Sequence, residues 1–399
     1  MSLLFLDIEA DISFIDTKLL LEVVMVDSVL LAAPRSFCAG VEMAIKALAW
    51  MVQAFEPPVY CYHEIVHNKI VVERFENIGV VFVNDIDEVP EGMPIMLSAH
   101  GSAPEVIATA EERGSYLVDA VCPLVTKVHH EVKTRANKGY QIIYVGHENH
   151  EEAVGTMAVA PEVIHRVDSV EDVEALPSFS EPVAILTQTT LSQSDWEGVL
   201  SAAEDKVENL WQPSRSDLCF ATTNRQSALI NIAPYCDAII VIGSANSSNT
   251  CSLVARAEET GCPRVYRVNN AEEVPNDLHG TIGVTAGASA PEEQVRAVID
   301  TLAPTQGVKE VRLNNETVYF PLPRNLRALV NAIDSIGVTF GLDYDCRPRL
   351  NDRTMDASQV LSFLDEEDSN LVDEQREEVR EDAISPRNGS SPAKVRALI

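Results

Sequence analysis

Three cysteines occupy the same kind of position in the chain, where an apolar strand gives way to a helix. The stretch VLLAAPRSFCAGVEMAI carries Cys38, SYLVDAVCPLVTKVHHEV carries Cys122, and SDLCFATTNRQSALINI carries Cys219. A helix N-terminus favours the thiolate form of cysteine, and the thiolate is the form that binds metals. Three thiolates at one point repel each other unless a cation lies between them. The positions therefore predict a shared metal centre if the fold brings them together.

Each cysteine is followed by two polar loops at nearly constant spacing. The first loop residue comes 29, 28 and 28 residues after its cysteine, and a second polar loop follows. The two sets are His67, His150 and Ser247, then His100, Thr189 and Ser289. The order of cysteine, polar loop and polar loop thus occurs three times. Such periodicity indicates one supersecondary unit used repeatedly.

The segments between these loops predict the fold class. The helix after Cys38 has apolar residues at the 3.6-residue period, and the strand before it is a short apolar run. Alternating strands and helices are typical of α/β proteins with mostly parallel sheets, whose ligand sites lie at the carboxyl ends of the strands. We therefore expect three similar α/β modules around a pseudo-threefold axis, with nine polar loops lining a central cavity.

The expected boundaries follow the repeat. The modules are predicted at residues 26–121, 122–218 and 219–309, with residues 310–327 packing back on the first module. Residues 1–25 are expected to be an N-terminal extension. Residues 328–399 contain the acidic run LDEEDSNLVDEQREEVRED and are expected to be largely disordered.

Composition excludes several functional classes. The formal net charge of −31 argues against binding nucleic acid through its phosphates, which requires basic patches. No apolar run approaches the roughly 20 residues that span a bilayer. The N-terminus lacks the charge pattern of a signal peptide. The sequence predicts a cytoplasmic protein in which the eight cysteines are reduced thiols or metal ligands.

Spacing alone leaves the metal open. Three cysteines can hold zinc with a free fourth position, or a [4Fe-4S] cluster with one iron not bound by protein. The remaining loops offer imidazole, hydroxyl and amide donors, a set that suits a small phosphorylated ligand. These candidate donors are His67, His100, His150, Ser247, Ser248, Asn249 and Ser289. A carboxylate beside His150 would give or take a proton.

Nine motifs, in order, resemble the family of 4-hydroxy-3-methylbut-2-enyl diphosphate reductases. They are PRSFCAGVEMAI, HEIVHNKIVV, SAHGSAP, DAVCPLVTKVHHEV, EEAVGTM, TQTTLS, CFATTNRQSA, GSANSSNT and VTAGASAPE. The resemblance extends from Val26 to Arg327, about three quarters of the chain. It implies three α/β modules around an oxygen-sensitive [4Fe-4S] cluster. The implied cluster ligands are Cys38, Cys122 and Cys219.

The resemblance also implies the reaction, the last step of the methylerythritol phosphate route to isoprenoids. An allylic diphosphate loses its hydroxyl as water to give isopentenyl and dimethylallyl diphosphate, and ferredoxin or flavodoxin supplies the electrons. Glu152 would deliver the proton and Thr189 would relay it. The diphosphate would be bound by His67, His100 and His150 with Thr189, Ser247, Ser248, Asn249 and Ser289. Many relatives have glycine at the position of Ser36 and proline at that of Glu151, and the extra carboxylate of Glu151 leaves two candidates for the acid.

Two other classes compete with this reading. A zinc-dependent hydrolase of a phosphorylated metabolite would need no electron donor. A non-catalytic iron–sulfur or anion sensor would bind its ligand without consuming it.

Overall fold

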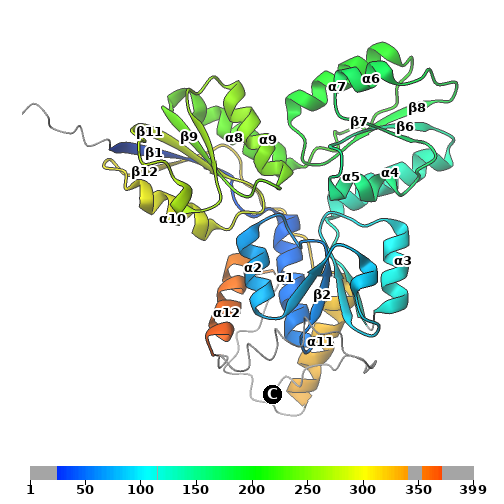
Figure 1. Ribbon diagram of the computed structural model, residues 1–399, viewed down its shortest axis with the longest axis horizontal. Helices are drawn as coiled ribbons and strands as arrows, with labels where there is room; N and C mark the ends of the chain where they lie inside the picture. Colours follow the sequence, from blue (N-terminus) through cyan, green and yellow to red (C-terminus); the bar gives the residue numbers. More distant parts are fainter. Residues whose placement is uncertain (1–24, 115, 340–352, 371–399) are drawn as a thin grey trace, which may run out of the picture.

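The computed structural model describes residues 25–114, 116–339 and 353–370. Three sheets, each flanked by helices, form three units around a common centre (Figure 1). Every strand pair within these sheets is parallel. The predicted α/β class with mostly parallel sheets is confirmed, and three sheets around one centre are consistent with a pseudo-threefold arrangement.

The sheets contain four, three and five strands. The first sheet has the order β3-β2-β4-β5 and is built from β2 (Val59–Tyr62), β3 (Val80–Val83), β4 (Pro94–Leu97) and β5 (Tyr116–Asp119). The second has the order β7-β6-β8 and is built from β6 (Gln141–Val145), β7 (Ile164–Val167) and β8 (Val183–Thr187). The third has the order β10-β9-β11-β1-β12 and is built from β1 (Val26–Ala33), β9 (Ala238–Ile242), β10 (Val265–Val268), β11 (Gly280–Ala286) and β12 (Val308–Arg312).

Helices connect and cover these strands. They are α1 (Ala39–Ala54), α2 (Lys69–Asn77), α3 (Pro104–Arg113), α4 (Pro123–Asn137), α5 (Glu151–Met157), α6 (Val170–Ala175), α7 (Gln193–Lys206), α8 (Phe220–Ile232), α9 (Ser248–Glu259), α10 (Glu292–Leu302), α11 (Arg324–Thr339) and α12 (Ala357–Asn370). Short 3₁₀ turns are η1 (Ile86–Glu88), η2 (Ala233–Tyr235) and η3 (Ala271–Glu273).

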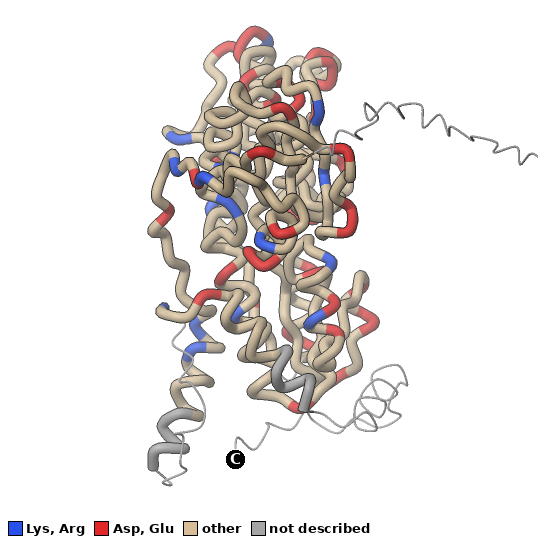
Figure 2. The backbone as a smooth tube through the Cα atoms, turned by 90° about the vertical axis from the view of Figure 1, so that its left-hand side faces the viewer, with Lys and Arg blue, Asp and Glu red and all other residues tan. Residues whose placement is uncertain are grey.

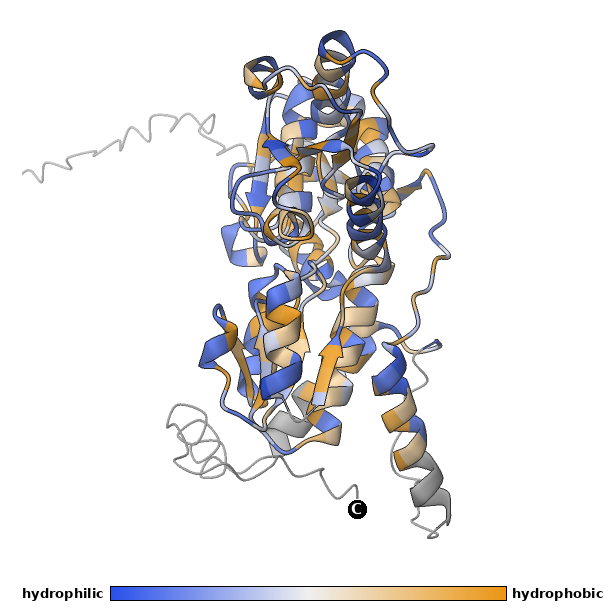
Figure 3. Cartoon of the chain, turned by 90° about the vertical axis from the view of Figure 1, so that its right-hand side faces the viewer, coloured by the Kyte–Doolittle hydropathy of each residue, from blue (hydrophilic) through white to orange (hydrophobic). Residues whose placement is uncertain are grey.

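Two strands, β8 (VAILT) and β9 (AIIVI), are buried at every residue and are almost entirely apolar. Such continuous runs are typical of parallel strands, whereas a strand with one solvated face alternates. In Figure 3 the strands are mostly hydrophobic, whereas the helices that surround them also carry hydrophilic residues.

The sheets reveal where the repeating unit begins. β5 leads to Cys122 and pairs with β4, and Trp211, which precedes Cys219, forms a parallel bridge with Ala184 of β8. β1 leads to Cys38 and pairs with β11 in the third sheet. Each cysteine therefore follows a segment that pairs with the sheet of one unit, and the helix after the cysteine belongs to the next unit. The cysteines lie at the junctions between units.

This arrangement corrects the expected placement of two segments. β1 was expected in the module of residues 26–121, but it lies in the third sheet, where it pairs with β11. β12 pairs with β1, so the returning chain also enters the third sheet first. Further along, Leu322 and Leu326 pack in the core around α1, as expected for residues 310–327.

Residues 328–399 were expected to be largely disordered, and the part of them that the structure describes, residues 328–339 and 353–370, is mostly helical. α11 and α12 pack against α1. In α12 the side chains of Val360, Leu361 and Leu364 are buried in the same core. Helix α12 is also anchored at its start, where the amide of Ala357 donates to Glu42 at 2.8 Å. Residues 1–24, 340–352 and 371–399, with Cys346 and the end of the acidic run, lie outside the described residues.

Removing one buried side chain of α12 should therefore destabilise the protein. Leu361→Ala is expected to lower the free energy of unfolding by about 2–5 kcal/mol, because Leu361 is fully buried and leaves a cavity. Denaturant unfolding followed by circular dichroism measures this. Phe363→Ala is the control, since that side chain is 37% exposed on the same helix. Equal, small effects of both changes would show that α12 does not dock in solution.

The surface is acidic in every unit. Asp and Glu recur along the whole molecule in Figure 2, with Lys and Arg between them. Of the helices in the described part of the chain, none combines the length and apolar character that crossing a bilayer requires.

Candidate active site

The polar loops of all three units line one central cavity. Its empty volume, open solvent at the mouth included, is about 730 Å³. The site residues predicted from the sequence all contribute to its wall: Cys38, Cys122, Cys219, His67, His100, His150, Glu152, Thr189, Ser247, Ser248, Asn249 and Ser289. Apolar side chains from α1 and α4, including Val41 and Leu124, also line it. The structure therefore brings the whole predicted set together.

Equivalent hydrogen bonds fix the three cysteines. Each precedes the first residue of a helix and has an extended backbone. Each backbone amide donates to a carbonyl in the loop after a neighbouring strand. These bonds run from Cys38 to Ala288 at 3.2 Å, from Cys122 to Ala99 at 3.0 Å and from Cys219 to Thr189 at 2.9 Å. The threefold repeat thus extends to the contacts that place each thiol.

Burial and neighbouring charge disfavour the thiolate form of Cys122 and Cys219 when no cation is bound between them. Burial, followed by the charge of Cys38, raises the pKa of Cys122 far above its usual range. The same two causes raise the pKa of Cys219 to about 12. In each case amides of the first helical turn oppose the shift by donating to the sulfur. A soft cationic group between the sulfurs would relieve the repulsion, so these residues fit a metal–sulfur centre.

The cysteines at the cavity wall provide three thiolate ligands, a set that could hold zinc with an open fourth position or an iron–sulfur cluster. Among the described residues that line the cavity there are three cysteines and no fourth. An iron–sulfur cluster with one iron not bound by protein matches this donor set.

Gly40 keeps the space beside the sulfurs clear. A Cβ at residue 40 would lie 2.8 Å from the Sγ of Cys122 and 3.9 Å from that of Cys38. The Cys122 side chain would have to rotate away, since the first distance is shorter than van der Waals contact allows. Gly40→Ala should therefore lower iron bound per chain severalfold while the metal-free protein keeps its melting temperature.

Gly198→Ala is the matched control for this change. Gly198 lies within α7 with nothing within 4 Å of an added Cβ, so iron should be unchanged and the helix slightly more stable. Full iron in Gly40→Ala would contradict the assigned position of the cluster.

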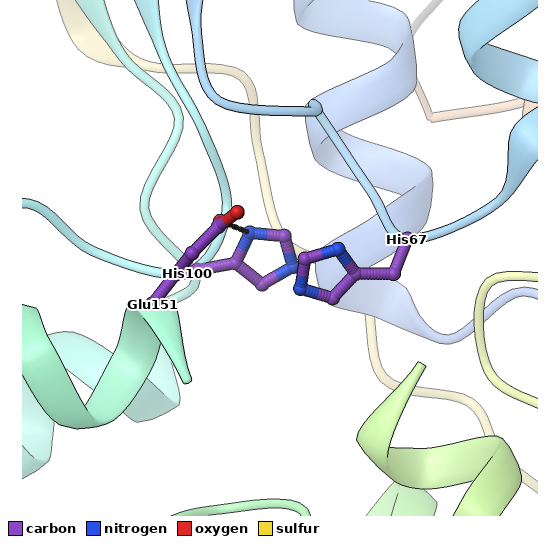
Figure 4. Close-up of side chains that lie close together, drawn as sticks. All are labelled: His67, His100 and Glu151. Atoms are coloured by element: carbon purple, nitrogen blue, oxygen red, sulfur yellow. Dashed lines mark ion pairs between the residues drawn. The ribbon is translucent and has the colours of Figure 1, made fainter. Parts of the chain in front are cut away.

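Three imidazole rings face the cavity from two units (Figure 4 shows two of them). His67 and His100 stack with ring centroids 4.0 Å apart, and His150 meets them edge-on at 5.7 and 6.2 Å. Burial, followed by repulsion from the neighbouring histidines, lowers the pKa of His150 to about 3 and also lowers the pKa of His100. An anion in the cavity would oppose both causes.

Hydrogen bonds set the direction in which these rings can donate. The Nδ1 of His150 accepts the amide of Glu152 at 3.2 Å, so its proton lies on Nε2, which is then the donor. The Nδ1 of His100 lies 2.7 Å from Glu151 and the Nδ1 of His67 lies 3.2 Å from Glu64. The Glu151 carboxylate behind His100 supports the protonation of that ring, which an anionic ligand would induce.

The two adjacent glutamates have opposite environments. Burial raises the pKa of Glu152 to about 7, although the amide and hydroxyl of Thr189 donate to its carboxylate at 2.7 and 2.9 Å. Burial would also raise the pKa of Glu151, but the hydrogen bond from His100 and the nearby imidazoles lower it to about 2. Glu152 can therefore hold a proton near neutral pH, whereas Glu151 stays ionised. This difference favours Glu152 as the acid.

The third unit supplies neutral polar groups. The hydroxyl of Ser289 donates to the His67 carbonyl at 2.9 Å, which ties the third unit to the first. The side-chain oxygen of Asn249 accepts the amide of Ala288 at 2.9 Å. Ser247 precedes α9, and Ser248 begins it. These contacts hold the serines and asparagine at the cavity wall.

The sequence reasoning missed three polar residues around this wall. Thr190 and Thr222 line the cavity. Gln188 is fully buried and donates to Ser248 at 3.3 Å, while Thr190 donates to the same hydroxyl at 2.9 Å. The sequence does carry a signal for these residues, because TQTT stands at the end of a buried strand and ATTN lies in the first turn of a helix after a cysteine.

Comparison with known proteins agrees with this geometry. The sequence model of the LytB protein family matches residues 29–303. A 4-hydroxy-3-methylbut-2-enyl diphosphate reductase of Mycobacterium ulcerans is 44% identical over 305 residues, covering 75% of this chain and 92% of the relative. One of the same name from Rhodopirellula baltica is 46% identical over 313 residues, covering 75% and 96%.

Solved structures give the same result. The E-1-hydroxy-2-methyl-but-2-enyl-4-diphosphate reductase of Plasmodium falciparum superposes with a TM-score of 0.74 at 32% identity, covering 77% of this chain and 99% of that one. A structure described as the terminal enzyme of the non-mevalonate pathway gives a TM-score of 0.52 at 30% identity, covering 69% and 99%. By sequence and by fold, the chain belongs to the LytB protein family.

Proposed function

We propose that this protein is a 4-hydroxy-3-methylbut-2-enyl diphosphate reductase, an oxidoreductase that removes the hydroxyl of (E)-4-hydroxy-3-methylbut-2-enyl diphosphate. The C–O bond breaks, and two electrons and two protons are consumed. One proton leaves with the hydroxyl as water and the other is added to carbon, giving isopentenyl or dimethylallyl diphosphate. The observation that carries the proposal is the single cavity with three thiols, three imidazoles and a protonatable glutamate on its wall.

Cys38, Cys122 and Cys219 would hold the cofactor, a [4Fe-4S] cluster. When bound there it supplies the electrons and, at the iron without a protein ligand, a Lewis acid for the substrate hydroxyl. An electron carrier of the ferredoxin or flavodoxin type would reduce it. We assign the enzyme to the cytoplasm, in keeping with the reduced cysteines.

The histidines and the third unit would bind the diphosphate. Nε2 of His150 donates directly, His100 becomes a donor at both ring nitrogens when the anion arrives, and His67 contributes its ring from the same wall. The hydroxyl and amide groups of Ser247, Ser248, Asn249 and Ser289 complete the site from the opposite unit. Apolar groups such as Val41 and Leu124 exclude water from the allylic part of the substrate.

Glu152 and Thr189 would deliver the proton. When Glu152 is protonated, its hydrogen bond with the Thr189 hydroxyl reverses, and that hydroxyl can turn its own proton into the cavity. Protonation of the leaving oxygen lowers the barrier to breaking the C–O bond. The apolar surroundings that raise the pKa of Glu152 to about 7 keep the proton available near neutral pH.

One observation favours a second candidate, a zinc-dependent hydrolase. Ligand atoms of His67, His100 and Glu151 lie within 4.8 Å of one another and could hold a divalent cation. In that case the protein would be colourless and would act without a reductant.

Anaerobic purification with iron, sulfide and zinc analysis tests both candidates. The reductase predicts about four irons and four sulfides per chain, and substrate-dependent oxidation of a chemical reductant. One zinc per chain with no sulfide, and hydrolysis of the substrate's phosphate without reductant, would replace the reductase by the hydrolase.

A further inference from the structure

Arg225 is a buried charge that does not line the cavity, and most of its contacts are with the segments that carry Cys38 and Cys219. It lies on α8, six residues after Cys219, and its side chain is fully buried. Neither the diphosphate site nor the proton path involves it. Because an isolated buried guanidinium is costly, its partners indicate what it does.

One side of the guanidinium holds the loop before Cys38. The Nη2 of Arg225 donates to the Ser36 carbonyl at 2.6 Å, and Nε donates to the same oxygen at 3.2 Å. The carbonyls of Arg35 and Phe37 lie 3.4 and 3.3 Å from Nη2. Three successive carbonyls thus converge on one group. Ser36 has a φ of 59°, in the left-handed region that non-glycine residues avoid, so this turn needs outside support.

The other side holds the start of α8 and an acidic partner. The Nη1 of Arg225 donates to the Ala221 carbonyl at 2.9 Å and lies 3.1 and 3.2 Å from the two carboxylate oxygens of Glu316. Ala221 is the second residue after Cys219. Asn224 also donates to Glu316 at 3.0 Å. One rigid, planar group therefore connects the segments that carry two cysteines, and the Glu316 carboxylate balances its charge.

We propose that Arg225 is a positioning residue that sets the separation of the Cys38 and Cys219 sulfurs and places a permanent positive charge beside the centre they bind. Glu316 tunes how strongly that charge acts. This inference rests on the proposed cluster. It assigns Arg225 a double role, in cluster retention through its fork of donors and in reduction potential through its charge.

The direction of the electrostatic effect follows from charge. Arg225 is fully buried between the segments that carry Cys38 and Cys219, so its charge is little screened by solvent. A positive charge beside the centre stabilises its reduced form, because that form carries one more negative charge. Arg225 therefore raises the reduction potential of the centre, and Glu316 lowers it.

Three variants separate the two roles. Arg225→Met removes the charge and the donors, Arg225→Lys keeps the charge but loses the fork, and Glu316→Gln keeps the fork but removes the balancing charge. Each is reconstituted anaerobically, and iron and sulfide per chain, the reduction potential from a spectroelectrochemical titration and the melting temperature of the metal-free protein are measured. Arg113→Met is the matched control, since Arg113 bonds to Asp87 and the Val89 carbonyl, which do not line the cavity.

The expected results differ for each variant. Arg225→Met should retain severalfold less iron, and its remaining centres should have a lower reduction potential. Arg225→Lys should also lose iron but keep a potential near that of the unmodified protein. Glu316→Gln should keep its iron and show a higher potential. Arg113→Met should change none of these.

Two results would overturn the inference, and each is distinct from failure of the proposed function. An unchanged potential in Glu316→Gln together with equal potentials in the two Arg225 variants would leave Arg225 with a purely structural role. Normal iron in Arg225→Met would remove its positioning role. If Arg225→Met does not fold, the comparison of Arg225→Lys with Glu316→Gln still decides both points. Failure of the proposed function would appear earlier, as an unmodified protein without iron and sulfide.

Discussion

Cys122→Ser is expected to bind less than a tenth of the iron of the unmodified protein and to lose measurable reductase activity. The hydroxyl of serine is a harder and far less acidic ligand than a thiol, and two remaining cysteines cannot hold a cluster against competing thiols in solution. The loss should not reflect unfolding, because serine is nearly isosteric with cysteine and the Cys122 amide keeps its bond to Ala99. Iron and sulfide analysis with the visible absorption spectrum measures the effect.

Cys251→Ser is the control for that change. Cys251 is exposed on α9, donates to the Ala245 carbonyl and does not line the cavity, so its replacement should leave iron content and activity unchanged. Equal iron in Cys122→Ser and in the unmodified protein would remove Cys122 from the ligand set. A fall in iron in both variants would point to a general effect of cysteine loss.

The repeat in the sequence was sufficient to predict which residues meet. Cysteines and polar loops at matching spacing all reach the cavity wall, because parallel strands of equivalent units end on the same side. The spacing could not predict at which residue a unit begins, because a repeat of constant length can be divided at any point along it. β1 shows the consequence: it precedes the first cysteine in sequence but completes the third sheet.

Local sequence was less informative where the outcome depends on tertiary packing. Glu151 and Glu152 are adjacent and chemically identical, and only the folded chain places one beside His100 and the other beside Thr189. In the C-terminal part, the high content of acidic residues favoured a prediction of disorder, although the segment contains an amphipathic helix. Val360, Leu361 and Leu364 face α1, although charged residues follow them directly. The amino-acid composition of the segment does not show how these apolar residues are spaced along the helix.

Glu152→Gln is expected to lower kcat by about 10²–10⁴-fold, the usual contribution of a general acid, with iron content and substrate affinity changed less than threefold. Glutamine has nearly the same shape but cannot carry the transferable proton, and its amide cannot accept from both donors of Thr189. Glu151→Gln is the matched comparison. It should instead weaken substrate binding, because it removes the carboxylate that supports protonation of His100.

The pH dependence provides an independent test of the same residue. Since the pKa of Glu152 is raised to about 7, its proton is present at lower pH and is lost as pH rises through that value. In the unmodified enzyme kcat/KM should therefore fall about tenfold per pH unit on the alkaline side. Glu152→Gln should lack this limb, because the residual rate no longer depends on that proton, whereas Glu151→Gln should retain it. Near-normal turnover in Glu152→Gln, or an unchanged alkaline limb, would show that the proton reaches the substrate by another route.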